Sequence, residues 1–279
     1  MLRTSNELRG MKIHTRDGEI GAVDQFYFDD EAWTIRYLVV DTGGWLSGRM
    51  VLISPISVRK ADWEARRVDV ALTKAQVENS PDISTHKTVS RQHEIEYMGY
   101  YGYPAYWGGL SLWGPGYYPG ALMPPPEGPP SPATVSPNFT VSRAAGTPDA
   151  AEEGDSHLRS SAEVDGYTIA AIDGEIGHVD GFLIDEDTWA IRYIEVATRN
   201  WWPGKKVLLS PGWIQRLSWE NASAVVFLTR EAIRSAPEYR EGMTVTREYE
   251  QQLYRHYGQP PYWDRAMAGQ VRAGGYGKE

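Results

Sequence analysis

The carboxylates best placed for acid–base chemistry stand in the motif Asp-Gly-Glu-Ile-Gly at residues 17–21, which recurs unchanged at 173–177. A general acid or base needs a nucleophile or a second titratable group within reach, and no such residue accompanies either copy. An Asp-Gly pair between extended segments favours a tight hairpin turn, because glycine adopts a positive φ at little cost. We therefore interpret as structural turn residues Asp17, Gly18 and Gly21, with their counterparts Asp173, Gly174 and Gly177.

Six histidines could act as general bases or metal ligands, namely His14, His86, His93, His157, His178 and His256. No two of them occupy corresponding positions in the two copies, and none lies at metal-ligand spacing from another. The chain has no cysteine, which excludes disulfides, thiolate metal sites and cysteine nucleophiles. The sequence therefore predicts no catalytic residue, no metal site and no cofactor shared by the copies. A site confined to one copy stays open.

A glycine-containing loop at residues 41–49 is a candidate phosphate-binding loop. The loop has no Gly-Lys-Ser/Thr ending and no amphipathic helix follows it, so the pattern of a phosphate loop is not met. The tryptophans of this loop and of the corresponding loop at 197–205 are instead candidates for a partner interface, namely Trp45, Trp201 and Trp202.

The elements that must position these residues occur twice. Residues 17–107 align without a gap on residues 173–263, and about 35 of the aligned positions are identical. Alternating apolar residues, with Pro55 as a stop, predict strands in the first copy at 23–29, 33–40, 51–55, 58–63 and 67–72. A threonine cap opens a short helix at 73–79, and a polar helical stretch follows at 91–98. With the equivalent segments of the second copy, the sequence predicts a mainly β fold of two small barrels, each followed by short helices.

The strand at 33–40 is apolar on both faces, but the second copy places Glu195 at the position of Val39. That substitution predicts that the odd-numbered side chains point outward, while Leu38 and Val40 point into the barrel. An outward row of Trp, Ile and Tyr indicates a covered surface. The further candidates for a partner or inter-repeat interface are therefore Trp33, Ile35, Tyr37, Trp189, Ile191 and Tyr193.

The same alternation puts two opposite charges on the inner face of adjoining strands in each copy. The pairs are Asp24 with Arg36, and Asp180 with Arg192. A pair of this kind would fix the strand register and neutralise both groups. The alternative is that each side chain reaches water separately, and the sequence leaves both open.

Proline and glycine divide the chain. Most of its 18 prolines lie between the copies, in a segment that cannot bury enough apolar surface to order itself. We therefore expect a first repeat at 1–107, a linker at 108–161, a second repeat at 162–263 and a flexible tail at 264–279. Each repeat ends in a Tyr/Pro/Trp segment, 101–107 or 257–263, which either docks on a barrel or is presented to a partner.

The overall charge is modestly acidic, with 28 Lys and Arg against 37 Asp and Glu. No basic field exists to attract phosphate backbones, so nucleic-acid binding is disfavoured. The beginning of the chain lacks the apolar core of a signal peptide, and no apolar run reaches the roughly 18 residues of a spanning helix. The sequence predicts a cytoplasmic protein without direct membrane insertion.

The order of four motifs carries a family resemblance. They are Asp-Gly-Glu-Ile-Gly, Val-Asp-x-Phe, Trp-x-Ile-Arg-Tyr-Leu-Val-Val-Asp-Thr-Gly-Gly-Trp and Val-Leu-Ile-Ser-Pro. In this order they resemble the PRC-barrel domain, found in the cytoplasmic part of the photosynthetic reaction-centre H subunit and in the C-terminal half of the ribosome-maturation factor. The resemblance implies a small bent β-barrel that binds other proteins and has no catalytic residues to carry over. The chain departs from the H subunit in having no membrane helix ahead of the barrel, and from the ribosome factor in lacking its other domain.

Three hypotheses for function follow. The first is a non-enzymatic binding or scaffolding protein that captures a protein partner or self-associates, either as an internal pseudo-dimer of its barrels or as a homodimer. The second is an accessory of photosynthetic reaction centres or of electron transfer, based on the resemblance alone. The third is small-molecule binding in a cleft between the barrels.

Overall fold

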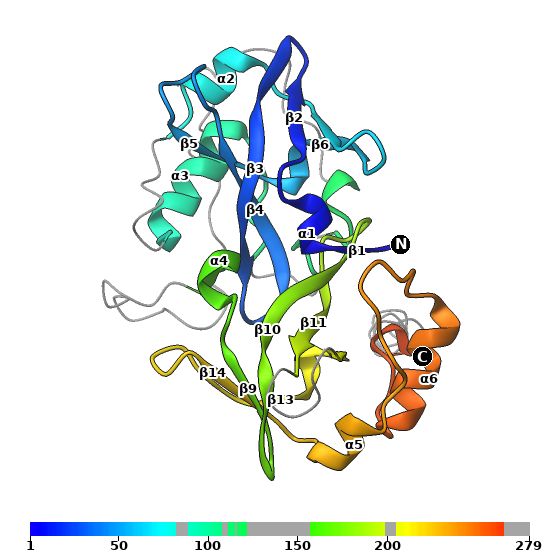
Figure 1. Ribbon diagram of the computed structural model, residues 1–279. Coiled ribbons are helices and arrows are strands. Elements are labelled where there is room, and N and C mark those ends of the chain that lie inside the picture. Colours follow the sequence, from blue (N-terminus) through cyan, green and yellow to red (C-terminus); the bar gives the residue numbers. More distant parts are fainter. Residues whose placement is uncertain (82–88, 108–110, 115, 122–156, 199–204, 265–279) are drawn as a thin grey trace, which may run out of the picture. The chain divides into compact units, whose positions relative to one another are not determined.

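The computed structural model describes residues 1–81, 89–107, 111–114, 116–121, 157–198 and 205–264. Its strands form two seven-stranded sheets with short helices (Figure 1), which confirms the predicted mainly β fold. The chain divides into two compact units. The first comprises Met1, Arg3–Asp165 and Phe182–Arg192, and the second comprises Leu2, Gly166–Gly181 and Tyr193–Glu279. Most of the expected linker and nearly all of the expected tail lie outside the described residues.

The strands of the first sheet run in the order β5-β4-β3-β2-β7-β6. They are β2 (Lys12–Thr15), β3 (Gly18–Asp29), β4 (Thr34–Asp41), β5 (Met50–Ile53), β6 (Val58–Asp62) and β7 (Arg67–Val70). Neighbours are antiparallel except β2 and β7, which are parallel. Pro55 opens the 3-10 turn η1 (Pro55–Ser57), which separates β5 from β6 and leaves these two strands at the ends of the path.

The second sheet repeats this order as β12-β11-β10-β9-β14-β13. Its strands are β9 (Thr168–Ala171), β10 (Gly174–Asp185), β11 (Ile191–Ala197), β12 (Lys206–Leu209), β13 (Ile214–Ser218) and β14 (Ser223–Val226). The pair β9 and β14 is again parallel, and the turn η4 (Pro211–Trp213) again begins at the proline of a Ser-Pro pair. The repeated sequence therefore specifies a repeated strand order.

Two short strands extend the repeat beyond the sequence alignment. They are β1 (Leu2–Thr4), which pairs with β10, and β8 (Leu158–Ser160), which pairs with β3. Each begins with Leu-Arg and leads into one helical turn, α1 (Ser5–Leu8) or α4 (Ser161–Val164). Residues 158–161 were expected in the linker, because a three-residue strand is too short to show a hydrophobic period.

Each copy closes with a short helix and a longer one. Threonine side chains cap α2 (Lys74–Glu78) and α5 (Arg230–Arg234), as predicted, because the threonine oxygen accepts an otherwise unsatisfied backbone N–H. The longer helices are α3 (Arg91–Tyr101) and α6 (Arg247–His256). A last turn, η2 (Pro119–Ala121), lies beside η1. No helix of the described residues is long and apolar enough to cross a membrane.

Two glycines of the repeated motif allow β3 and β10 to pass close to a neighbouring backbone. A Cβ on Gly21 would lie 2.0 Å from the carbonyl oxygen of Asp41, and one on Gly177 would lie 2.0 Å from that of Ala197. Gly21 also has a φ of +149°. No other residue type fits such a contact without moving a strand.

We expect Gly21→Ala to lower the free energy of unfolding by about 2–4 kcal/mol, because the new methyl group collides with backbone and not with a flexible side chain. Urea unfolding measures the loss. Gly44→Ala is the control, since nothing lies within 4 Å of its Cβ position, and it should change stability by less than about 0.5 kcal/mol. Equal effects of the two substitutions would contradict the close approach.

Candidate functional site

The predicted aromatic row on β4 is covered by the chain itself. Ile35 and Tyr37 are fully buried. The Tyr37 ring lies edge-on to Tyr97 of α3 at a centroid distance of 5.0 Å, and its hydroxyl donates to Glu94 Oε1 at 3.2 Å. Tyr193 in the second copy is equally buried. The proposal of these tyrosines as a partner surface is therefore corrected, because each repeat's own trailing helix occupies that face.

Glu94 on α3 is the centre of the polar contacts that hold this cover in place. Its carboxylate is fully buried and accepts from the hydroxyls of Tyr37 and Tyr106. Arg91 and the ring of His157 lie 3.1 and 3.0 Å from its Oε2. A buried carboxylate is tolerated when it is paired and hydrogen-bonded. Tyr106 belongs to the first Tyr/Pro/Trp segment, so the contact shows that this segment docks on the fold.

The second copy repeats the arrangement. Tyr193 donates to Glu250 Oε1 at 3.0 Å, and Arg247 lies 3.1 Å from Glu250 Oε2. Sequence reasoning missed this cluster. The signal was present as an Arg-x-x-Glu pattern at corresponding positions of both polar helices, 91–94 and 247–250. An identical charged pair within otherwise divergent helices indicates a buried partner.

The predicted partners of the strand arginines are wrong. Arg36 pairs with Asp29 at 3.0 Å and Arg192 with Asp185 at 2.9 Å, whereas Asp24 is exposed. Two register shifts between β3 and β4 explain the error, because they leave Asp24 and Arg36 as the extra residues of β-bulges. Strict alternation therefore fails at both positions. Asp180 instead lies 2.7 Å from Lys206.

The Arg36 ion pair is buried under aromatic rings. Its guanidinium lies 4.0 Å from the ring centroid of Tyr106 and 4.9 Å from that of Trp113. Burial tends to raise the pKa of Asp29, but Arg36 and two backbone N–H donors outweigh it and hold that pKa below its usual value. Trp113 is fully buried and donates its indole N–H to the carbonyl of Thr188 at 2.8 Å. Part of the expected linker is thus built into the first unit.

The Asp-Gly turns lie between β2 and β3 and between β9 and β10. Asp17 Oδ1 accepts from the backbone N–H of Lys74 at 2.8 Å, and Asp173 Oδ1 accepts from that of Arg230 at the same distance. The hydrogen bond from Lys74 lowers the pKa of Asp17. Both carboxylates therefore tie a turn to the start of the following short helix. Gly18 takes a φ of +136° in the first of these turns.

Trp33 and Trp189 hold the turns that follow β3 and β10 in a strained conformation. Both have a positive φ, 48° and 60°, which costs a bulky residue about 1–3 kcal/mol. Within the first unit, the carbonyl of Trp189 accepts from Ile35 N at 2.9 Å and the carbonyl of Trp33 accepts from Ile191 N at 2.7 Å. The strain is offset by two hydrogen bonds that join these turns.

Further contacts of the first unit come in matched pairs. Ser161 Oγ accepts from the backbone N–H of Phe26, and Ser5 Oγ accepts from that of Phe182, both at 3.1 Å. Arg159 likewise pairs with Asp30 at 2.8 Å, as Arg3 pairs with Glu186 at 3.1 Å. The members of each pair occupy corresponding positions of the repeat. The first unit therefore contains the same set of contacts twice.

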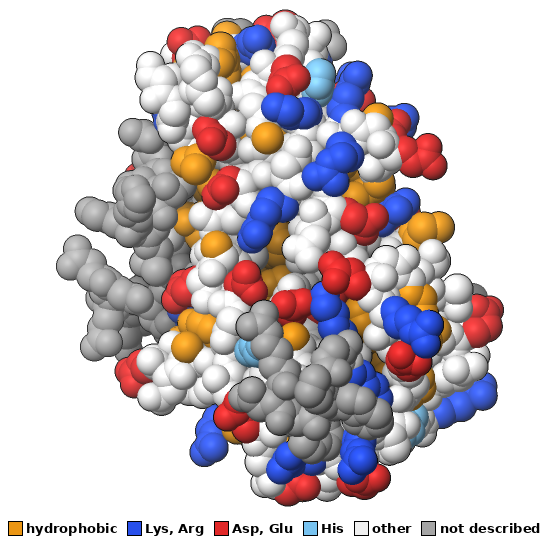
Figure 2. Space-filling view, viewed as in Figure 1, with side chains coloured by type: hydrophobic (Ala, Val, Ile, Leu, Met, Phe, Trp, Pro, Cys, Tyr) orange, Lys and Arg blue, Asp and Glu red, His pale blue; other side chains and the backbone are white. Residues whose placement is uncertain are grey.

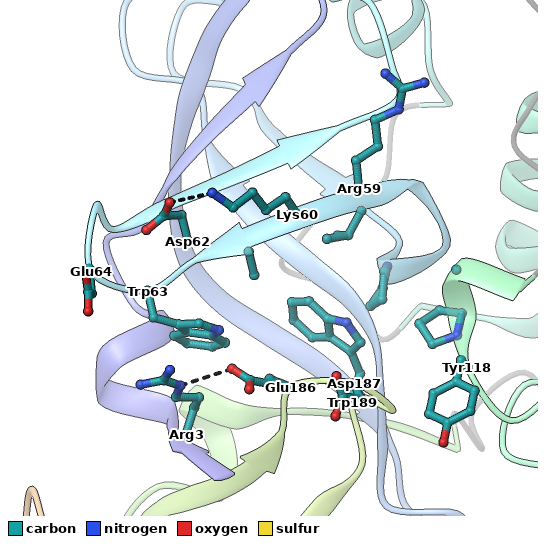
Figure 3. Close-up of a pocket in the computed structure, with 15 residues that line it drawn as sticks. Arg3, Arg59, Lys60, Asp62, Trp63, Glu64, Tyr118, Glu186, Asp187 and Trp189 are labelled. Atoms are coloured by element: carbon teal, nitrogen blue, oxygen red, sulfur yellow. Dashed lines mark hydrogen bonds and ion pairs between the residues drawn. The ribbon is translucent and has the colours of Figure 1, made fainter. Parts of the chain in front are cut away.

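A groove of about 770 Å³ opens in the first unit beside the edge strand β6. Figure 3 shows Trp63 and Trp189 between β6 and the turn that carries Glu186, with Tyr118 at the end away from Arg3. Trp63 is half-buried, and Tyr118 is 52% exposed. Three aromatic side chains from distant parts of the sequence thus meet in one hollow. Trp189 is one of the predicted interface residues.

The loop tryptophans fall elsewhere. Trp45 is half-buried beside a smaller hollow of about 330 Å³. The ammonium of Lys74 lies 5.4 Å from the centre of its ring. Trp201 and Trp202 lie outside the described residues. Trp45 therefore presents less aromatic surface than the groove beside β6.

The second unit holds a charge cluster around the buried Glu195. Lys206 Nζ lies 2.7 Å from Asp180, 2.9 Å from Glu241 and 3.6 Å from Glu195. Glu195 is 1% exposed, and its carboxylate faces the ammonium of Lys206. Burial raises its pKa to about 7; Lys206 opposes this shift, while Glu241 and Asp180 add to it. The buried Tyr239 also faces this carboxylate.

Glu94 and Glu250 are buried and ion-paired, and Glu195 is surrounded by other charges. No group of three or more His, Cys, Asp or Glu residues in the described ranges could hold a metal ion. The groove beside β6 offers aromatic faces and ion-paired side chains to a ligand.

These features define the chain as a mainly β protein with two sheets of one strand order and a preformed groove in its first unit. A family model described as the PRC-barrel domain matches residues 2–77. Residues 2–77 are therefore a PRC-barrel domain, as the motifs indicated, and the second sheet repeats its strand order. A comparison with curated proteins found no match.

We expect Glu94→Ala to destabilise the fold by about 3 kcal/mol, because it leaves the buried hydroxyl of Tyr37 without its acceptor and removes one of two polar partners of the Tyr106 hydroxyl. Thermal or urea unfolding provides the measurement. Glu96→Ala, an exposed position on the same helix, is the control and should shift stability by less than about 0.5 kcal/mol. A cluster without structural importance would give equal values for both variants.

Glu195 should make stability depend on pH in the direction opposite to an ordinary salt-bridged carboxylate. Its folded pKa of about 7 exceeds the reference value of 4.5, so stability is lost as pH rises from about 4.5 to 7. Glu195→Gln should therefore be more stable than the parent at pH 8, by up to about 3 kcal/mol. The advantage should disappear below pH 4.5. Glu241→Gln, an exposed member of the same cluster, is the control, and an equal gain there would contradict the assignment.

Proposed function

We propose that this chain is a non-enzymatic, cytoplasmic protein-binding module that captures its partner in the groove beside β6. The observation that carries the proposal is the meeting of Trp63, Trp189 and Tyr118 in one preformed hollow. Aromatic side chains dominate the energetics of protein interfaces because they bury much area with few torsions to order. The PRC-barrel match at residues 2–77 indicates a general-purpose domain and does not specify the partner.

The lining of the groove favours binding over catalysis. Among the residues that the structure describes, the lining contains no histidine, serine, threonine or cysteine. Two of its carboxylates are engaged by neighbouring cations: Asp62 lies 2.8 Å from Lys60, and Glu186 lies 3.1 Å from Arg3. Covalent catalysis needs a nucleophile activated by an adjacent base, whereas Lys60 and Asp62 neutralise each other in an ion pair. Its ion pairs instead fix the shape of the walls.

The distribution of surface charge favours a partner that is recognised by its shape more than by its charge. Figure 2 shows acidic and basic side chains mingled with hydrophobic ones over the face drawn, without a broad patch of one sign. Such a distribution gives little electrostatic steering. The partner is thus expected to be a protein, and self-association of the chain is the competing form of the same proposal.

Affinity purification from the source cells, with identification by mass spectrometry, tests this function. Tyr118→Ala should lose the specific partner without loss of stability, because Tyr118 is 52% exposed. Ile95→Ala is the matched control, since Ile95 is an equally exposed apolar residue of the first unit outside the groove. Retention of every partner by Tyr118→Ala would contradict the proposal. Sedimentation of the purified chain distinguishes self-association.

A further inference from the structure

The two indoles of the groove are held in place before any ligand arrives. The guanidinium of Arg3 lies 5.4 Å from the ring centroid of Trp63 and is itself fixed by Glu186 at 3.1 Å. Trp189 is 3% exposed and sits on a backbone of positive φ. Preorganised aromatic faces bind with a small loss of conformational entropy.

The neighbouring strand is poorly suited to accept another strand. β6 has five residues, and its register with β7 shifts between Val58 and Lys60, so that Arg59 is the extra residue of a bulge. Short, bulged and charged edge strands resist strand addition. A ligand of this groove should therefore need no ladder of backbone hydrogen bonds. The polyproline II conformation meets that condition, and aromatic grooves recognise it.

A proline already packs in this groove. Pro119 of η2 is buried, lines the groove next to Tyr118, and belongs to a turn that lies beside η1. Pro55, the first residue of η1, lines the same hollow. The walls thus accommodate pyrrolidine rings beside aromatic ones.

The charged residues at the rim of the groove favour one kind of polar group in a ligand. Lys60 is neutralised by Asp62, and Arg3 by Glu186. Arg59 is exposed and forms no ion pair within the described residues. A carboxylate next to the apolar part of a ligand would complement Arg59.

We propose that the groove formed by Trp63, Trp189 and Tyr118 binds an extended proline-rich segment of a partner protein, with an acidic residue of that segment facing Arg59. This assignment rests on the proposed function and gives it a ligand class. The prolines would stack on the accessible faces of Trp63 and Tyr118, with the buried Trp189 as the floor between them, and the carboxylate would set the direction of the segment.

Calorimetric titration of the full chain with a blocked peptide of six prolines followed by one glutamate tests the proposal. We expect saturable binding of one peptide per chain. Trp63→Ala should weaken it at least about tenfold. Trp219→Ala, the corresponding residue of the second repeat, should bind within about twofold of the parent. Tyr118→Ala serves as a second groove variant whose fold is not at risk, because that side chain is exposed.

Two altered peptides separate the contributions. Replacing alternate prolines by alanine should abolish saturable binding, because the alanine peptide lacks the preset conformation. Exchanging the glutamate for lysine should weaken binding by the parent and strengthen binding by Arg59→Glu. Equal binding of all peptides, or equal loss in Trp63→Ala and Trp219→Ala, would overturn the assignment.

The remaining outcomes distinguish other occupants. If the peptide does not bind while a cellular partner still depends on Tyr118, the proline chemistry is wrong and the proposed function stands. If both fail, both proposals are overturned. A dimer that Trp63→Ala dissociates would make a second copy the occupant. Peptide binding that requires prior replacement of Pro124, Pro125 and Pro126 by alanine would assign the groove to the chain's own prolines.

Discussion

The first unit depends on two backbone hydrogen bonds between turns that are distant in sequence. Ile35 and Ile191 donate to the carbonyls of Trp189 and Trp33, and each acceptor has a strained, left-handed backbone. These bonds fix the segment Phe182–Arg192 in the first unit. Trp189, which that segment contributes, then becomes a wall of the groove beside β6. The groove is thus a consequence of how the repeated chain is connected, and the sheet of the first repeat alone does not contain it.

Much of the fold could be predicted because its signals are local. Long strands show a clear hydrophobic period, and Thr73 marks a helix start by its capping chemistry. The partners of Arg36 could not be predicted, because two bulges change which side chains face each other and bulges have no period of their own. The groove was equally hidden. Trp63 and Tyr118 carry no common pattern in sequence, and only the folded chain brings them together.

The two copies show which polar residues serve architecture and which are particular to one copy. The buried glutamates at 94 and 250 have the same tyrosine and arginine partners, so the cluster belongs to the repeated fold. Glu195 stands where the first copy has Val39, and its charge is held among Lys206 and two carboxylates. Comparison of the two copies thus distinguishes polar residues that the repeated fold requires, such as Glu94 and Glu250, from Glu195, which is particular to the second copy.

The first unit is not one continuous stretch of the chain, because it is completed by Phe182–Arg192. A ribosome that adds about 5–20 residues per second releases the first repeat several seconds before this segment emerges. During that interval the nascent first repeat carries Trp63 without Trp189, and the groove has one of its indoles. The groove is therefore complete only after Phe182–Arg192 of the second repeat has left the ribosome.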